Sequence, residues 1–260
     1  WSKVMPDIKD KLPIFSWENL ATTNIELAKK FYQGLFGWDV TDIPTGTYVT
    51  HSFFSLHGTE VCSVSEIKEK QRKSFASQWV PYISIENIEE LIGRIQNSGG
   101  AVLDAISPIA DAGQTTIIKD PTNAIFAVWH PSKNARLRRN EVPGMPCFHE
   151  LMTTNLDMAG MFYVKIFNWS PRAENFGDIT YIMFDAENLN VGSMMGVPNQ
   201  NFQPRWITYW CVQDCDRSLR KALSLGGKIS KTVEIIKRKG RYAILADPLG
   251  AIFGIMEPVN

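Results

Sequence analysis

The chain has 260 residues, which is comfortable for two domains of ordinary size. Its 27 Lys and Arg balance its 27 Asp and Glu, so it lacks the positive excess that nucleic-acid or anionic-membrane binding requires. No apolar run approaches the roughly 20 residues of a membrane span, and no signal peptide is visible, although processing before Trp1 stays open. Four cysteines are too few for a disulfide scaffold, which favours reduced thiols and a cytoplasmic protein.

The first half of the chain repeats one order of elements: a strand, a helix and three extended segments. Asn24 and Asn87 are predicted to cap the helices, which carry apolar residues on one face and end at Gly37 and at Gly99-Gly100. The first copy is predicted to have a strand at 14–20, a helix at 25–36 and extended runs from 38, at 48–56 and at 61–67. The second copy is predicted to have a strand at 79–85, a helix from 88, and strands at 102–109, 114–119 and 124–129.

Residues 132–146 have little apolar content and predict a linker. The same order of elements then returns. The predicted segments are strands at 148–152, 179–185, 191–195, 206–212 and 251–256, with helices at 156–167 and near 217–225.

Identical residues recur at nearly constant spacing in the two halves. Thr22-Thr23-Asn24, Phe31-Tyr32, Phe36 and Trp38 return 131 residues later, while Trp79-x-x-Tyr82, Gly99-Gly100 and Asp120-Pro121 return 127 residues later. Chance does not readily place so many identities at such constant spacing. The sequence therefore predicts a duplicated scaffold, with a tight Asp-Pro turn before the last strand of each half.

These motifs resemble the vicinal-oxygen-chelate superfamily, which includes glyoxalase I, extradiol dioxygenases and bleomycin-resistance proteins. In more detail, the chain looks like the two-domain glyoxalase-like proteins of actinobacteria. The resemblance implies an α+β fold of two glyoxalase-like domains, in which four βαβββ modules form two cupped mixed sheets with helices outside. We expect the domains at 13–131 and 147–258.

The resemblance also implies where a divalent metal would be bound. Three of the family's ligand positions fall in each half, on Trp17, Val80, Ala127, Phe148, Ile207 and Gly254. None of these side chains can ligate a metal, and the register of a fourth position near 61–64 stays open. We therefore expect neither the usual metal site nor a cofactor, with displaced ligands such as His149 and Glu150 as the alternative.

Strand alternation predicts the side chains that line the two cups. The expected ligand-binding residues are Trp17, Asn19, Tyr82 and Trp129 in the first half and Phe148, Ile207, Gly254 and Met256 in the second. Mostly apolar and aromatic lining is typical of small-molecule pockets, although these side chains could equally fill the cups as core. Ala127 and Gly254, in place of a glutamate, are expected to open space.

Glu150 and Tyr209 are the candidate catalytic residues. A carboxyl in an apolar cup has a raised pKa, as a general acid or base requires, and Tyr209 is its expected hydrogen-bonding partner. The alternative is a solvated Glu150. His149 has the opposite parity and is expected to be structural. Arg241 is expected either to bind an anionic ligand group at the cup rim or to pair with a surface acid, and the basic run 237–241 to be a solvated turn.

The sequence thus favours a protein that holds a small apolar or aromatic organic molecule, without the family's usual metal. One alternative is a lyase, isomerase or hydroxylase-like enzyme that uses Glu150 and Tyr209. Another is a divalent-metal lyase or dioxygenase with displaced ligands. A homodimer is possible, and no nucleic-acid or membrane partner is expected.

Overall fold

The computed structural model describes residues 12–45, 48–69, 76–109, 112–132, 142–176, 179–236 and 240–259. The expected linker lies mostly outside these ranges, as do residues 237–239 of the basic run.

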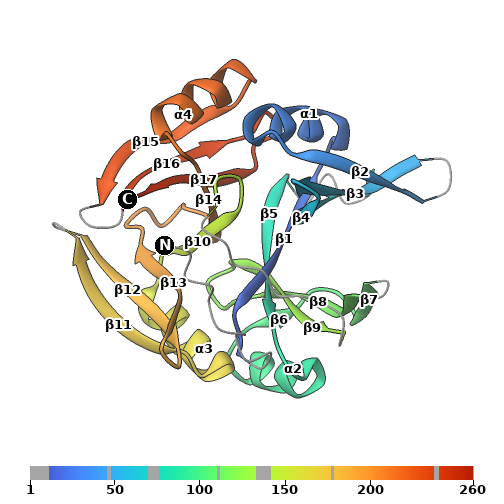
Figure 1. Ribbon diagram of the computed structural model, residues 1–260. Helices are drawn as coiled ribbons and strands as arrows, with labels where there is room; N and C mark the ends of the chain where they lie inside the picture. The colour runs from blue at the N-terminus through green and yellow to red at the C-terminus, as the bar shows by residue number, and fades with distance from the viewer. Residues whose placement is uncertain are drawn as a thin grey trace. The chain divides into compact units, whose positions relative to one another are not determined.

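The strands form two mixed sheets (Figure 1). The first sheet has the order β2-β3-β4-β1-β5-β9-β8-β6, with β7 paired to β8. Its strands are β1 (Phe15–Thr22), β2 (Asp39–Thr45), β3 (Tyr48–Leu56), β4 (Thr59–Glu66), β5 (Gln78–Ser84), β6 (Ala101–Val102), β7 (Ser107–Ile109), β8 (Gly113–Lys119) and β9 (Ile125–Pro131). Parallel pairs β1–β4 and β5–β9 occur beside antiparallel hairpins.

The second sheet repeats this arrangement, with the order β11-β12-β13-β10-β14-β17-β16-β15. Its strands are β10 (Pro146–Thr153), β11 (Ser170–Phe176), β12 (Ile179–Ala186), β13 (Leu189–Gly196), β14 (Arg205–Cys211), β15 (Lys228–Ile236), β16 (Gly240–Ala246) and β17 (Ile252–Pro258). The two-sheet fold predicted from the repeated motifs is confirmed. The domain boundaries at 131 and 147 stay a prediction.

Each repeat contributes one helix, and each helix begins at a side-chain cap. The helices are α1 (Ile25–Phe36), α2 (Ile88–Asn97), α3 (Leu156–Phe167) and α4 (Cys215–Ser224). Asn24, Asn87, Asn155 and Asp214 each accept a hydrogen bond from the backbone N–H three residues ahead. The longest described helices have 12 residues, well short of what crossing a bilayer needs.

Three local predictions need correction. Helix α4 begins at Cys215 rather than near Arg217, because Asp214 is its cap. The strand expected at 102–109 is two short pieces, β6 and β7, and Pro108 in β7 has no N–H to give to a continuous ladder. Strand β11 was not predicted, since most of its residues are exposed and it has no apolar alternation.

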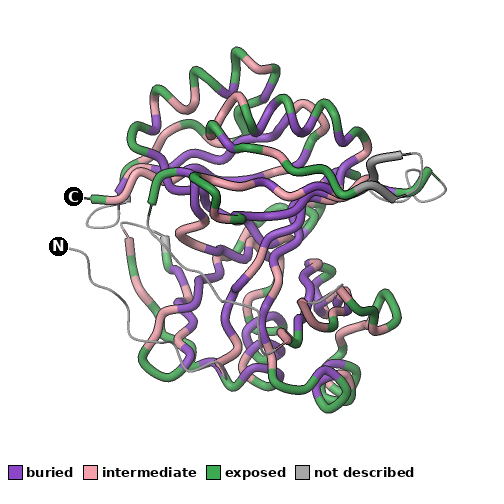
Figure 2. The backbone as a smooth tube through the Cα atoms, turned by 45° about the vertical axis from the view of Figure 1, so that its right-hand side comes forward, coloured by how far each residue is buried: buried purple, intermediate pink, exposed green. Residues whose placement is uncertain are grey.

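The contacts divide the chain into two compact units that combine distant segments. The α2–α3 unit comprises the described parts of Trp1–Ser16, Tyr82–Arg138 and Leu151–Arg205, and the α1–α4 unit those of Trp17–Pro81, Arg139–Glu150 and Trp206–Asn260. In the α1–α4 unit, α1 packs beside α4, and α4 lies against β15, β16 and β17 (Figure 1). The outer helix surfaces are exposed, while strand residues beneath them are buried (Figure 2).

The repeated motifs meet in the same way inside each unit. The Tyr32 hydroxyl of α1 donates to Asp247 Oδ2 at 3.1 Å, and the Tyr163 hydroxyl of α3 donates to Asp120 Oδ2 at 2.9 Å. The other oxygen of each aspartate accepts backbone N–H groups of its own turn. The aspartate of the Asp-Pro turn therefore both closes that turn and anchors the helix of another repeat.

Candidate functional site

Within the α1–α4 unit, successive residues of each strand of the second sheet point to opposite faces of that sheet. Residues of one face, including Trp210, Leu245, Phe253 and Ile255, belong to the buried cluster that also contains residues of α1 and α4. The opposite face, called here the Glu150 face, carries the alternate residues of β10, β14, β16 and β17. They include Phe148, Glu150, Ile207, Tyr209, Tyr242, Gly254 and Met256.

Glu150 and Tyr209 form the polar centre of this face. The Tyr209 hydroxyl donates to Glu150 Oε2 at 2.8 Å, and the two residues are only 4% and 2% exposed. Burial raises the pKa of the Glu150 carboxyl from 4.5 to about 7, while the Tyr209 hydrogen bond and the charge of Lys231 oppose that rise. The expected hydrogen bond is present, and the carboxyl is poised to gain or lose a proton near neutral pH.

Aromatic rings surround this pair. The ring of Tyr209 packs against Phe148 at a centroid distance of 6.2 Å and against Tyr242 at 5.9 Å. Phe148 and Met256 are half-buried, whereas Ile207 is fully buried. The predicted residues Phe148, Glu150 and Tyr209 are thus brought into direct contact.

Gly254 does not open space, in contrast to the expectation from the sequence. Gly254 is paired with Tyr209 across the parallel strands β17 and β14. A Cβ atom at position 254 would lie 2.2 Å from Tyr209 Cδ1. The absence of a side chain at Gly254 is therefore what allows the tyrosine ring to lie flat on this strand.

A charged group at the edge of the Glu150 face was missed from the sequence. Lys231 Nζ donates to the Tyr242 hydroxyl at 2.7 Å, and this hydroxyl donates to Glu234 Oε2 at 2.9 Å. Lys231 and Glu234 also pair with each other at 2.9 Å. Two residues three apart in an ordinary strand point to opposite faces, so alternation gave no signal for this cluster.

The predicted residues of the first sheet are divided between the two units. In the α1–α4 unit, Trp17 Nε1 donates to Ser63 Oγ at 3.0 Å, and the Asn19 amide exchanges hydrogen bonds with Ser63 and Ser65. In the α2–α3 unit, Tyr82 lies opposite Ala127, and Trp129 donates to the carbonyl of Ala112. The amide of Asn19 is therefore held within a structural network.

Arg241 lies on the face opposite Glu150, next to α4. Its guanidinium pairs with Asp216 at 2.6 Å and with Glu257 at 3.3 Å. Of the two roles considered from the sequence, pairing with surface acids is the one that the structure contains.

At the described positions where the resemblance places the family's ligands, the side chains do not fit its usual metal. Neither Gly254 nor Phe148 offers a donor, and the ring of Tyr209 fills the space beside Gly254. His149 and Glu150 are strand neighbours that point to opposite faces: His149 reaches Glu18 and Glu150 reaches Tyr209. Within the described ranges, no three His, Cys, Asp or Glu side chains gather as a metal site would require.

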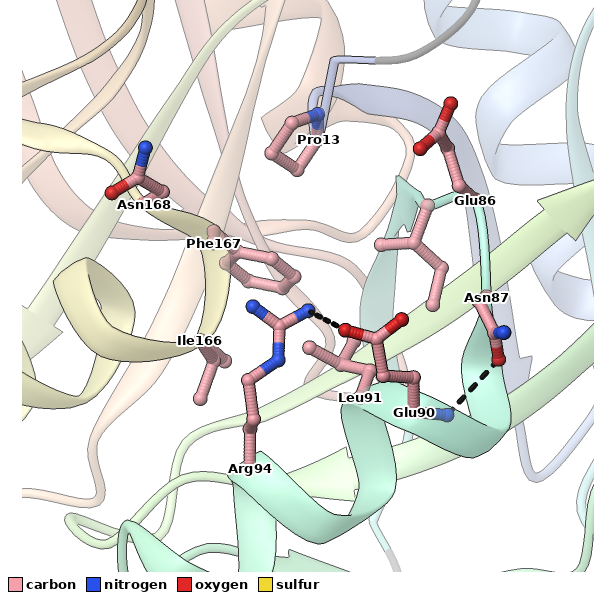
Figure 3. Close-up of a pocket in the computed structure, with 10 residues that line it drawn as sticks. Pro13, Glu86, Asn87, Glu90, Leu91, Arg94, Ile166, Phe167 and Asn168 are labelled. Atoms are coloured by element: carbon pink, nitrogen blue, oxygen red, sulfur yellow. Dashed lines mark hydrogen bonds and ion pairs between the residues drawn. The ribbon is translucent and has the colours of Figure 1, made fainter.

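A separate groove of about 480 Å³ lies in the α2–α3 unit, between the start of α2 and the end of α3 (Figure 3). Arg94 and Glu90 form an ion pair at 3.9 Å across its floor, and Asn87 caps α2 at one end. None of the predicted site residues lines this groove. Its lining residues are Pro13, Ile85, Glu86, Asn87, Glu90, Leu91, Arg94, Ile166, Phe167 and Asn168.

Comparison with known proteins identifies similar proteins and one matching family. Residues 14–128 match the model of the Glyoxalase/Bleomycin resistance protein/Dioxygenase superfamily. The chain is 29% identical over 245 residues to a protein of Mycobacterium tuberculosis (strain CDC 1551 / Oshkosh) named "Putative glyoxylase CFP32", covering 94% of each chain. It is 28% identical over 258 residues to the anthracycline biosynthesis protein DnrV of Streptomyces peucetius, covering 93% of this chain and 92% of that one.

A solved structure has the same fold. The Mn(II)-bound glyoxalase from Novosphingobium aromaticivorans aligns with 96% of this chain and 84% of its own, with a TM-score of 0.63 and 15% identity. The family match and the shared fold agree with the likeness expected from the repeated motifs: the chain resembles the glyoxalase/vicinal-oxygen-chelate superfamily.

Proposed function

We propose that the Glu150 face binds a small, flat, largely aromatic organic molecule without the metal that the family usually employs. The observation that carries the proposal is the buried Glu150–Tyr209 hydrogen bond set among aromatic rings. Rings offer a stacking surface, while one carboxyl fixes the orientation of a polar group on the ligand. The name of DnrV supports this class of ligand, because anthracyclines are polycyclic aromatic ketones.

A second candidate function is proton-transfer catalysis at the same place. A general acid or base works best when its pKa is near the working pH, and burial gives Glu150 a pKa of about 7. In this role the Glu150 carboxylate takes a proton from carbon next to a ligand carbonyl; an isomerase then returns the proton to a carbon of the same ligand, whereas a lyase lets the resulting enolate expel a leaving group from the neighbouring carbon. The Tyr209 hydroxyl holds the carboxyl in place through its 2.8 Å hydrogen bond.

Binding is tested with 2-tetralone, a two-ring aromatic ketone, by titration calorimetry. We expect Phe148→Ala to weaken binding by about tenfold, since it removes a ring that packs on Tyr209. The matched control is Phe53→Ala on β3, where the ring packs on Trp17 of the first sheet. Equal losses in both variants, or no binding to the wild type, would overturn the proposed site.

Catalysis is tested by proton–deuterium exchange at the carbon next to the 2-tetralone carbonyl, followed by NMR. If Glu150 transfers protons, the wild type accelerates exchange above the buffer rate. Glu150→Gln then binds 2-tetralone as before but loses the acceleration. Binding without any acceleration by the wild type removes the catalytic candidate and leaves the binding function.

A further inference from the structure

Strand β15 contains two shifts of register that bring two of its charged side chains to the Tyr242 hydroxyl. Its pairing with β16 shifts register between Ile229 and Lys231 and again between Lys231 and Glu234. Such bulges re-aim side chains and are frequent next to functional sites. Here they allow Lys231 and Glu234, which regular alternation would separate, to reach the Tyr242 hydroxyl together at 2.7 and 2.9 Å.

This charged cluster is continuous with the Glu150 face. The buried ring of Tyr242 packs against Tyr209, whose hydroxyl is bonded to Glu150. Lys231 is close enough for its charge to act on the Glu150 carboxyl. The side chains of Lys231 and Glu234 remain 29% and 44% exposed, so the cluster is open to water where the ring pair is not.

The Lys231 ammonium has a donor left for another group. An ammonium carries three N–H donors, and among the described residues Tyr242 and Glu234 take two of them. A Lys–Glu pair on a surface contributes little to stability and requires no bulge. The gain in stability therefore does not account for the distorted strand. Placing a cation beside aromatic rings does account for it.

We propose that Lys231 binds an anionic oxygen of the aromatic ligand, whose rings lie against the half-buried Phe148. The proposal rests on the proposed function and adds the class of ligand, an aromatic acid. The ammonium supplies a charge-assisted hydrogen bond to that oxygen. The ligand's uncharged part meets Glu150, whose protonated form donates a hydrogen bond and does not repel the anion.

The test compares 2-naphthoate with its neutral isostere 2-naphthamide by titration calorimetry at about pH 6, where the naphthoate is ionised. We expect the wild type to bind naphthoate at least about tenfold more tightly than the amide. Lys231→Met should bring this ratio to about one and change affinity for the amide less than about twofold. The control Lys228→Met, at an exposed position of the same strand, should keep the wild-type ratio.

A second arm uses pH between about 6 and 8. As the pH rises through about 7, Glu150 ionises and repels the naphthoate, so naphthoate binding weakens while amide binding does not. Tyr209, Tyr242, Lys231 and Glu234 are the other titratable groups around Glu150. The Lys231 hydrogen bond lowers the pKa of Glu234, so Glu150→Gln should remove the pH dependence.

The outcomes separate the two proposals. The role of Lys231 is overturned if the wild type shows no preference for naphthoate, or if the preference survives in Lys231→Met. The proposed function stands in either case, provided that binding of the amide depends on Phe148. If the wild type binds 2-tetralone but neither naphthoate nor the amide, only the role of Lys231 is overturned; if it binds none of the three, both proposals are overturned.

Discussion

Glu18 and His149 occupy the same position in the two halves of the sequence, 131 residues apart, and their side chains meet. Glu18 Oε1 lies 2.6 Å from His149 Nε2, and the Thr208 hydroxyl donates to Glu18 Oε2 at 2.8 Å. All three residues are buried. His149 and Thr208 directly precede Glu150 and Tyr209 in the chain, so one buried network holds the two strands that carry the candidate site.

Exchanging the two residues tests this symmetry. Each single change, Glu18→His or His149→Glu, places like side chains in contact, and we expect it to lower the free energy of unfolding by about 3–5 kcal/mol. The double variant restores an unlike pair at matching positions. It should recover most of the lost unfolding free energy. About 1 kcal/mol should remain lost, because the hydrogen bond from Thr208 to Glu18 is not restored.

Urea denaturation of the four proteins gives these values as a double-mutant cycle. A double variant as unstable as the sum of its singles would show that the two positions are not interchangeable.

Glu150→Gln should make stability less dependent on pH. The unfolded carboxyl has a pKa of 4.5 and the folded one about 7. Below pH 4.5 both states hold the proton; as the pH rises to about 7 the unfolded state releases it first, so the wild type loses up to about 3 kcal/mol of stability. Glutamine still accepts the Tyr209 hydrogen bond and does not ionise.

The variant should therefore melt at a higher temperature than the wild type at pH 8, with the difference vanishing near pH 4.5, as scanning calorimetry would show. Glu234→Gln is the control with the opposite sign. The Lys231 hydrogen bond lowers the pKa of Glu234, so that carboxylate contributes stability above its ordinary pKa. Parallel pH profiles for Glu150→Gln and wild type would contradict the raised pKa.

Gly254→Ala should displace the Tyr209 ring. The new methyl group would overlap Tyr209 Cδ1, and we expect a loss of about 1–3 kcal/mol in unfolding free energy. Combining it with Tyr209→Ser should cost less than the sum of the two changes, because the smaller side chain removes the clash. Gly93→Ala is the control: its Cβ meets open space in α2, so it should gain up to about 1 kcal/mol. A Gly254→Ala variant with the stability of the wild type would contradict the close packing of Tyr209 on Gly254.

Tyr32→Phe and Tyr163→Phe should destabilise the protein to a similar extent. Each removes a hydroxyl that donates to the aspartate of an Asp-Pro turn, and leaving a buried acceptor unpaired costs about 1–3 kcal/mol. Guanidinium unfolding would measure both. A loss of stability confined to one tyrosine variant would show that the two repeats do not use the motif equivalently. Tyr32→Phe combined with Asp247→Asn should lower the unfolding free energy by less than the sum of the two single changes.

The fold was predictable because each repeat carries its own local signals. The caps Asn24, Asn87 and Asn155 and the two Asp-Pro turns specify where helices begin and last strands follow, and the structure contains all of them. The same repeats conceal which elements pack together. Nothing local to Tyr32 indicates that its partner is Asp247.

The candidate site was predictable only in part. Alternation brought Phe148, Glu150 and Tyr209 onto one face, and the structure places them in contact. It could not find Lys231, because a bulge breaks the alternation on which the prediction depended. Alternation also predicted open space at Gly254. It could not show that the Tyr209 ring fills this space, because that depends on which strands are neighbours in the sheet.

The hydrogen bond from Tyr32 to Asp247 spans 215 residues, and this has a consequence for how the chain is made. Residues 17–81 leave the ribosome long before residues 206–260, with which they form one compact unit. The side of α1 that packs against Phe253 therefore stays exposed until the last segment has been synthesised. Long-range pairing of this kind slows folding and exposes intermediates to aggregation. A fragment that ends after the first sheet would carry the same uncovered surface permanently.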